Sequence, residues 1–124
     1  MSSIGNSLRH HAALRPDHVA FIEGERRVTY RELDLLASGC ARGLAEKGVG
    51  PGTRVAIVLP NSIEWVIAYQ AILRAGAVPV PLNPLLADVE IEAILQDCEP
   101  AALFTRRSRG AANARWLVLD RFDN

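Results

Sequence analysis

The spacing of apolar residues changes several times along the chain, and each change marks a predicted element. Apolar side chains recur at helical intervals between Thr29 and Gly48, which predicts an amphipathic helix. Thr29 is followed three residues later by Glu32, which predicts a capping box at the start of this helix, and Gly48 predicts its end. The run Val55–Leu59 is apolar at every position, as expected of a parallel strand that is covered on both faces.

Further elements are predicted on both sides of this strand. Asn61 and Glu64 are spaced as the N-cap and N3 residues of a helix over Ser62–Ala75, which ends at Gly76. The other predicted elements are a helix Ile4–Leu14, a hairpin of Val19–Ile22 with Arg27–Thr29, a strand Val78–Leu82, a helix Asp88–Asp97, a strand Ala101–Thr105 and a fourth strand over Trp116–Leu119. Strands and helices alternate from Val55 onward, which predicts an α/β fold with a mostly parallel sheet and right-handed crossovers.

Two prolines indicate where one of these strands lies in the sheet. Pro79 and Pro81 are two residues apart, so their missing N–H groups belong to the same side of the strand Val78–Leu82. That side cannot form a normal ladder. We therefore expect this strand at an edge of the sheet, with Val55–Leu59 lying between it and Ala101–Thr105.

The helix Ser62–Ala75 is apolar around most of its circumference and needs cover on nearly every side. Two explanations remain open from the sequence. In the first, the chain is part of a larger fold, and the other segments of that fold cover the helix. In the second, Trp65 or Tyr69 packs against the first helix of the chain itself.

Composition excludes several classes of protein. The 124 residues are 49% hydrophobic, and 14 Lys and Arg balance 14 Asp and Glu, so no basic excess favours nucleic acid or a membrane surface. No run approaches the length of a membrane span, and Met1–Arg15 lacks the apolar core of a signal peptide, so a cytoplasmic protein is expected. Cys40 and Cys98 lie far apart without a metal-ligand spacing and are expected to be small buried apolar residues.

Candidate chemistry within the sequence is sparse. Nucleotide-binding α/β domains place glycines after the first strand, but Pro60–Ser62 follows it here, and the glycines of Gly48–Gly52 precede it. No Walker-type motif occurs, and no metal site is assigned. The arginines within Arg106–Arg109 follow a strand at the end where open α/β sheets bind ligands, which leaves either an anion site or a solvated loop.

Several phrases of the sequence occur together in one family. They are Thr29–Leu33, Gly48–Gly52, Val55–Asn61 followed by Glu64, Ala75–Val78, and Val80–Pro84 followed by Glu90 and Ile91. In this order and spacing the chain resembles the amino-terminal part of the adenylate-forming acyl-CoA synthetases, from about Arg15 to Leu119. One departure is Ala87, where family members usually have a Ser or Thr as helix cap, and its loss is expected to cost about 1 kcal/mol.

The resemblance implies a two-step reaction of the full-length enzymes. A carboxylic acid attacks ATP, assisted by magnesium, to give an acyl-adenylate and pyrophosphate, and the thiol of CoA then displaces AMP. The family's phosphate loop, adenine-ribose motif, hinge and catalytic lysine do not occur in this sequence. Residues 1–124 are therefore expected to be a single incomplete domain that binds no cofactor and has no activity alone.

The resemblance also implies one local site and a set of partners. The loop Leu82–Leu85 matches a family segment beside the acyl and pantetheine channel, so Asn83, Pro84 and Leu85 are candidate channel residues. Expected partners are the remainder of the synthetase, a complementing chain, or a second copy of this chain. The alternatives are a non-catalytic module that docks on a partner through apolar helix faces, and a small independent ligand-binding α/β domain.

Overall fold

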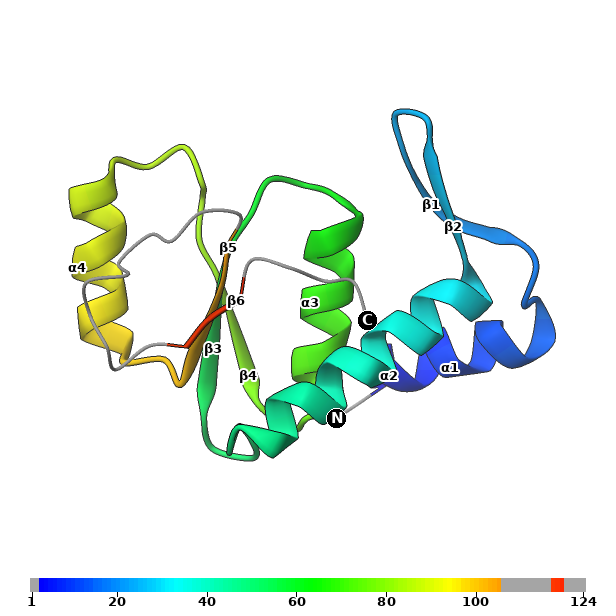
Figure 1. Ribbon diagram of the computed structural model, residues 1–124, viewed down its shortest axis with the longest axis horizontal. Coiled ribbons are helices and arrows are strands. Elements are labelled where there is room, and N and C mark those ends of the chain that lie inside the picture. Colours follow the sequence, from blue (N-terminus) through cyan, green and yellow to red (C-terminus); the bar gives the residue numbers. More distant parts are fainter. Residues whose placement is uncertain (1–2, 106–116, 120–124) are drawn as a thin grey trace.

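The computed structural model describes the backbone of residues 3–105 and 117–119 and the side chains of residues 8–105. The chain begins with a helix and a hairpin, continues through a second helix, and then alternates strands with helices (Figure 1). The elements are α1 (Ser3–Leu14), β1 (Val19–Glu23), β2 (Arg26–Thr29), α2 (Tyr30–Glu46), β3 (Arg54–Val58), α3 (Ile63–Arg74), β4 (Val78–Pro81), α4 (Asp88–Cys98), β5 (Ala102–Thr105) and β6 (Leu117–Leu119). The α/β class expected from the alternation is confirmed.

The main sheet has the order β4-β3-β5-β6, with every described neighbouring pair parallel. Val55 of β3 lies opposite Pro79 of β4 on one side and opposite Ala102 of β5 on the other. β4 is one of the two terminal strands among those described, and β3 lies between β4 and β5. Both positions agree with the prediction drawn from the two prolines.

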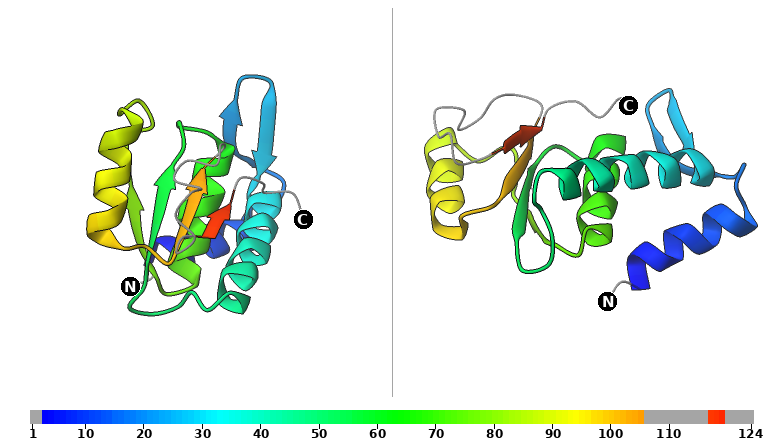
Figure 2. Two further views of the ribbon diagram at one scale, coloured as in Figure 1. Left: turned by 60° about the vertical axis from the view of Figure 1, so that its left-hand side comes forward. Right: turned by 60° about the horizontal axis from the view of Figure 1, so that its bottom comes forward.

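Helices cover the main sheet on both faces (Figures 1 and 2). α4 covers one face, where Ile91 and Leu95 pack with Leu103 of β5 in one apolar cluster. α3 and α2 lie on the opposite face, where Ile72 and Phe104 belong to a second cluster. These residues are at most 2% exposed, so the two clusters form a core on each side of a sheet that is apolar on both faces.

α2 begins as the sequence predicts. The Thr29 hydroxyl accepts a hydrogen bond from Glu32 N at 3.1 Å, and the Glu32 carboxylate accepts one from Thr29 N at 2.8 Å. This reciprocal pair satisfies two N–H groups that a helix start otherwise leaves open. Gly48, just after the helix, has a φ of +87°, which a residue with a side chain adopts only at a cost.

The start of α3 corrects one prediction. The N-cap is Ser62 and not Asn61, because the Ser62 hydroxyl accepts from Trp65 N at 3.1 Å. The same hydroxyl donates to the carbonyl of Pro60 at 2.9 Å, and the side chain is only 1% exposed. Ser62 therefore fixes both the loop that leaves β3 and the first turn of the helix.

The chain itself supplies most of the cover that α3 needs. No residue of α3 is exposed, and the helix packs on the sheet, on α2 and on α1. Trp65 and Tyr69 are partly buried against the sheet-side cluster and do not belong to the cluster beneath α1. The chain itself thus covers much of the apolar circumference of α3, and Trp65 and Tyr69 pack on the sheet side and not on α1, where the second explanation had placed them.

Three smaller predictions have mixed outcomes. The side chain of Ala87 makes no cap at the start of α4, and the Glu90 carboxylate accepts from Ala87 N at 3.0 Å. Cys40 and Cys98 form no disulfide, but they are only partly buried, where full burial was expected. Burial raises the pKa of Cys40 to about 11.

Among the helices of the described residues, none is both long and apolar enough to cross a membrane.

Candidate functional site: a pocket at the ends of β3 and β4

A pocket of about 510 Å³ opens where β3 and β4 end. Parallel neighbours have their carboxyl ends at one edge of the sheet, so the loops that follow β3 and β4 lie at the same end of the molecule (Figure 1). The pocket is lined by Leu59, Pro60, Asn61, Trp65, Pro81, Leu82, Asn83, Pro84 and Leu85. We call it the β3–β4 pocket.

All three residues of the sequence-predicted channel loop, Asn83, Pro84 and Leu85, line this pocket. Asn83 shapes the loop: its side-chain oxygen accepts from Leu85 N at 2.9 Å, and its carbonyl accepts from Leu86 N at 3.2 Å. An asparagine that holds the backbone two residues ahead is a common turn device. The turn leaves the Leu85 side chain 90% exposed at the pocket rim. Contact between this loop and a ligand stays a prediction.

The opposite wall comes from α3 and the loop before it. Trp65 lies in the first turn of α3, where the Ser62 cap fixes the backbone. Its ring stacks on that of Tyr69, with centroids 5.1 Å apart and planes 13° from parallel. Stacking one turn apart on a helix restricts the motion of the indole that lines the pocket.

The lining determines which chemistry the pocket fits. None of the nine lining residues carries a charged side chain, and only Asn61 and Asn83 carry side-chain amides. A phosphate bound here would lack the cations that normally offset its charge. The pocket is suited to an uncharged group with apolar surface and at most a few hydrogen-bonding atoms.

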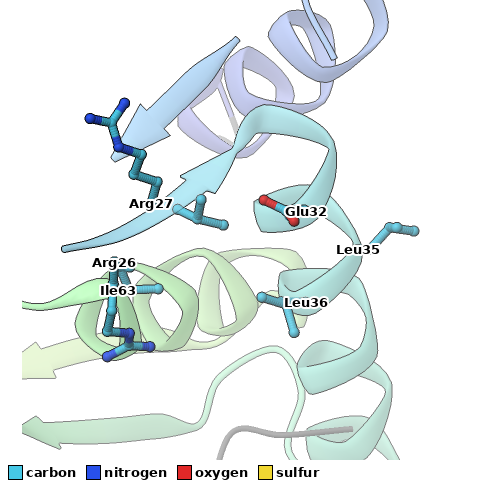
Figure 3. A pocket seen from close by; sticks show the side chains of 7 residues that line it. Arg26, Arg27, Glu32, Leu35, Leu36 and Ile63 are labelled. Carbon is cyan, nitrogen blue, oxygen red and sulfur yellow. The ribbon is translucent and has the colours of Figure 1, made fainter. Parts of the chain in front are cut away.

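A second hollow of about 470 Å³ lies between the hairpin and the starts of α2 and α3 (Figure 3). Two of its three charged lining residues, Arg26 and Glu32, make hydrogen bonds with other residues of the chain. Arg26 donates to both carboxylate oxygens of Glu64, at 3.1 and 2.6 Å, and Glu32 caps α2. Figure 3 shows the side chain of Leu35 pointing outward and that of Leu36 pointing toward α3. The bonds of Arg26 and Glu32 attach the hairpin to α3 and hold the start of α2, so we assign no ligand to this hollow.

The described residues do not fit the cofactors of the full-length enzymes. Within residues 3–105 and 117–119, no cluster of three or more His, Cys, Asp or Glu side chains is placed to hold a metal ion. The β3–β4 pocket offers no cation for the phosphates of ATP. No catalytic step can therefore be derived for magnesium or ATP from these residues.

The sequence-based prediction of a channel loop named Asn83, Pro84 and Leu85 and left out the other residues that line this pocket. Asn61 and Trp65 were assigned to the start of a helix, although they follow the strand that neighbours the predicted loop. The sequence did contain a signal for these residues. Adjacent parallel strands have their carboxyl ends at the same edge of the sheet, so the residues after β3 are expected near the loop after β4. The arginines within Arg106–Arg109 lie outside the described residues, so their candidate anion site has no structural test.

Comparison with known proteins identifies the family. The family model for "AMP-binding enzyme" matches residues 8–121. The long-chain-fatty-acid–CoA ligase FadD13 of Mycobacterium tuberculosis is 38% identical over 99 residues, which are 78% of this chain and 20% of that protein. The dimodular nonribosomal peptide synthase of Bacillus subtilis is 39% identical over 94 residues, which are 76% of this chain and 4% of that protein.

The solved structure of a Mycobacterium tuberculosis fatty acyl CoA synthetase superposes with a TM-score of 0.83 at 30% identity. The match covers 97% of this chain and 27% of that one, so the fold is shared and this chain spans about a quarter of the solved protein. The match to the family model extends over nearly all of the sequence, from the last part of α1 to just past β6. The chain belongs to the AMP-binding enzyme family.

Proposed function

We propose that this chain is the amino-terminal portion of an ATP-dependent acyl-CoA synthetase. The full-length enzyme would join a carboxylic acid to CoA by way of an acyl-adenylate, with release of pyrophosphate and then AMP. The observation that carries the proposal is the family match over residues 8–121, together with the likeness to FadD13 and to the solved fatty acyl CoA synthetase. The peptide synthase matches at an identity similar to that of the CoA ligase. An experiment must therefore decide whether CoA is the acceptor of the acyl group.

The role of this chain in the reaction is to build one wall of the acyl and CoA channel. The β3–β4 pocket supports this role because its lining is apolar, aromatic and uncharged. An acyl chain, or the amide-bearing arm of CoA, fits such a lining, whereas a triphosphate does not. Asn83 would contribute its side-chain N–H groups, since its oxygen is engaged by Leu85 N.

Adenylation itself requires groups beyond those described here. The α-phosphate must be approached by cations and backbone donors that neutralise the developing charge. In our proposal these groups come from the remainder of the synthetase or from a complementing chain. The purified chain, supplied with ATP, magnesium, CoA and a series of acids, should then release no pyrophosphate.

A chimaera tests the proposal directly. The matching residues of FadD13 are replaced by those of this chain, and acyl-CoA and pyrophosphate are measured with a long-chain acid, ATP, magnesium and CoA. Formation of both products would support the proposal. A folded chimaera that releases pyrophosphate but forms no thioester would contradict the CoA step, and one that releases no pyrophosphate would contradict the shared role altogether.

The channel role has its own test in the same chimaera. Replacing Asn83 by Ala should raise the KM for CoA or for the acid, because the pocket loses both a turn and a donor. Gln96→Ala, at an exposed position of α4 that does not line the pocket, serves as the matched control. Unchanged KM values in the Asn83 variant would leave the loop as a plain turn.

A further inference from the structure

The outer edge of β4 has an unusual backbone. Val78 N donates to Thr53 O at 2.8 Å, and Leu82 N donates to Ile57 O at 2.9 Å, so these two positions face β3. Backbone direction alternates along a strand, and Pro79 and Pro81 therefore direct their nitrogen and carbonyl groups away from β3. Both outward nitrogens belong to prolines and carry no hydrogen.

Prolines at positions 79 and 81 leave the hydrogen bonds between β4 and β3 intact. A proline at Val78 or Val80 would remove a donor that faces β3. At positions 79 and 81 the donors that are lost would face outward from the sheet. The outer edge keeps its carbonyl acceptors and has no N–H group along β4.

This edge would otherwise invite pairing with another strand. β4 is short and apolar, and Val78, its first residue, is 51% exposed. An unprotected terminal strand of this kind templates association with further chains. Two copies of this chain could meet here about a twofold axis, which would place β4 antiparallel to itself.

We propose that Pro79 and Pro81 close the β4 edge to pairing with a second copy of this chain. In a symmetric pair of β4 strands, every outward backbone group on both strands comes from a proline. Neither copy has a donor to offer, so no hydrogen bond forms and the carbonyls of both strands lose water without replacement. The edge is thereby closed to a second β4 strand, although its carbonyl groups remain as acceptors.

The test restores the outward donors. In the double variant Pro79→Thr, Pro81→Thr, the strand gains two N–H groups at its free edge. We expect the weight-average mass measured by light scattering to rise above that of the wild type at equal concentration. Nuclear magnetic resonance hydrogen exchange should show the new amides of residues 79 and 81 protected, and the protection should weaken on dilution.

A control variant distinguishes the effect of restoring N–H groups at the β4 edge from the effect of removing any two prolines. The variant Pro16→Thr, Pro51→Thr also removes two prolines, both outside β4, and should keep the mass of the wild type. If the double β4 variant does not fold, Pro81→Thr alone carries the test, because this residue is exposed at the end of the strand. A folded β4 variant that keeps the wild-type mass, or whose amides 79 and 81 exchange freely at high concentration, would overturn the proposal.

Discussion

The carboxylate of Glu23 accepts a hydrogen bond from the backbone N–H of Ile63 at 3.0 Å, across 40 residues of sequence. Glu23 ends β1 and Ile63 begins α3, so the tip of the hairpin supplies a negative charge to the start of a helix. Helix starts carry unpaired N–H groups and a partial positive charge, and both are stabilised by a carboxylate. The adjoining ion pair of Arg26, at the start of β2, with Glu64 attaches the other strand of the hairpin to α3.

Removing this carboxylate should weaken the attachment of the hairpin. We expect Glu23→Ala to lower the free energy of unfolding by about 1 kcal/mol, the usual cost of losing a cap. Glu25→Ala provides the control, because Glu25 is exposed in the turn of the hairpin and should change stability by less than about 0.5 kcal/mol. Urea titration of both variants measures the difference, and equal midpoints would argue against the role of Glu23.

Arg74 is a nearly buried charge that depends on α2. Its side chain is 6% exposed and donates to the Asp34 carboxylate at 2.5 Å and to the Ser38 hydroxyl at 2.6 Å. Asp34→Ala should cost about 3 kcal/mol, because it leaves a buried guanidinium without its counter-ion. The double variant Asp34→Leu, Arg74→Met should recover most of this loss.

Arg42→Met, at an exposed position of α2, controls for removal of an arginine and should be near neutral. Chemical denaturation of the four proteins gives the comparison. A double variant as unstable as Asp34→Ala would show that the ion pair is not the cause.

Two glycine-to-alanine substitutions should act in opposite directions. Gly76 has a φ of +79°, and a Cβ added there would lie 3.3 Å from Cγ of Pro51, so Gly76→Ala should destabilise by about 1–3 kcal/mol. Gly43 lies within α2 with open space around an added Cβ, so Gly43→Ala should stabilise by up to about 1 kcal/mol. Thermal melts that move in the same direction would contradict the backbone argument.

The thiol of Cys40 should make stability fall at high pH. Burial raises its pKa in the folded chain to about 11 from an ordinary value of 9.0. Between these pH values the unfolded chain has lost the proton and the folded chain keeps it, so unfolding becomes more favourable as pH rises. The contribution is complete below pH 9 and is lost toward pH 11.

Cys40→Ala removes this contribution and leaves the other groups that titrate at high pH. The difference in unfolding free energy between wild type and variant, measured by urea titration across this range, should therefore shrink with rising pH. A difference that stays constant would show that Cys40 does not titrate as its burial implies.

Local signals in the sequence predicted most of the fold. The Thr29 and Glu32 pair, the stop at Gly48 and the prolines of β4 each act within a few residues, so their effect could be predicted without tertiary structure. Asn61 and Ser62 are both good caps, and the structure uses Ser62, whose hydroxyl accepts from Trp65 N and donates to the Pro60 carbonyl.

Contacts between distant segments could not be predicted in this way. The pairs of Glu23 with Ile63 and of Arg26 with Glu64 join residues 40 and 38 positions apart. No periodicity encodes them, because they depend on where the hairpin comes to lie. The lining of the β3–β4 pocket shows the same limit: the loop at Asn83 has a recognisable sequence, whereas Trp65 comes to line the same pocket only through the arrangement of two strands.

The central place of β3 has a consequence for biosynthesis. Both of its neighbours are encoded after it, and β5 emerges from the ribosome more than forty residues later than β3. Until Thr105 is translated, one side of β3, which is apolar at every position after Arg54, has no partner in the nascent polypeptide. Synthesis of this segment therefore passes through a stage that favours capture by a chaperone, and slow codons between Pro81 and Ala102 would prolong it.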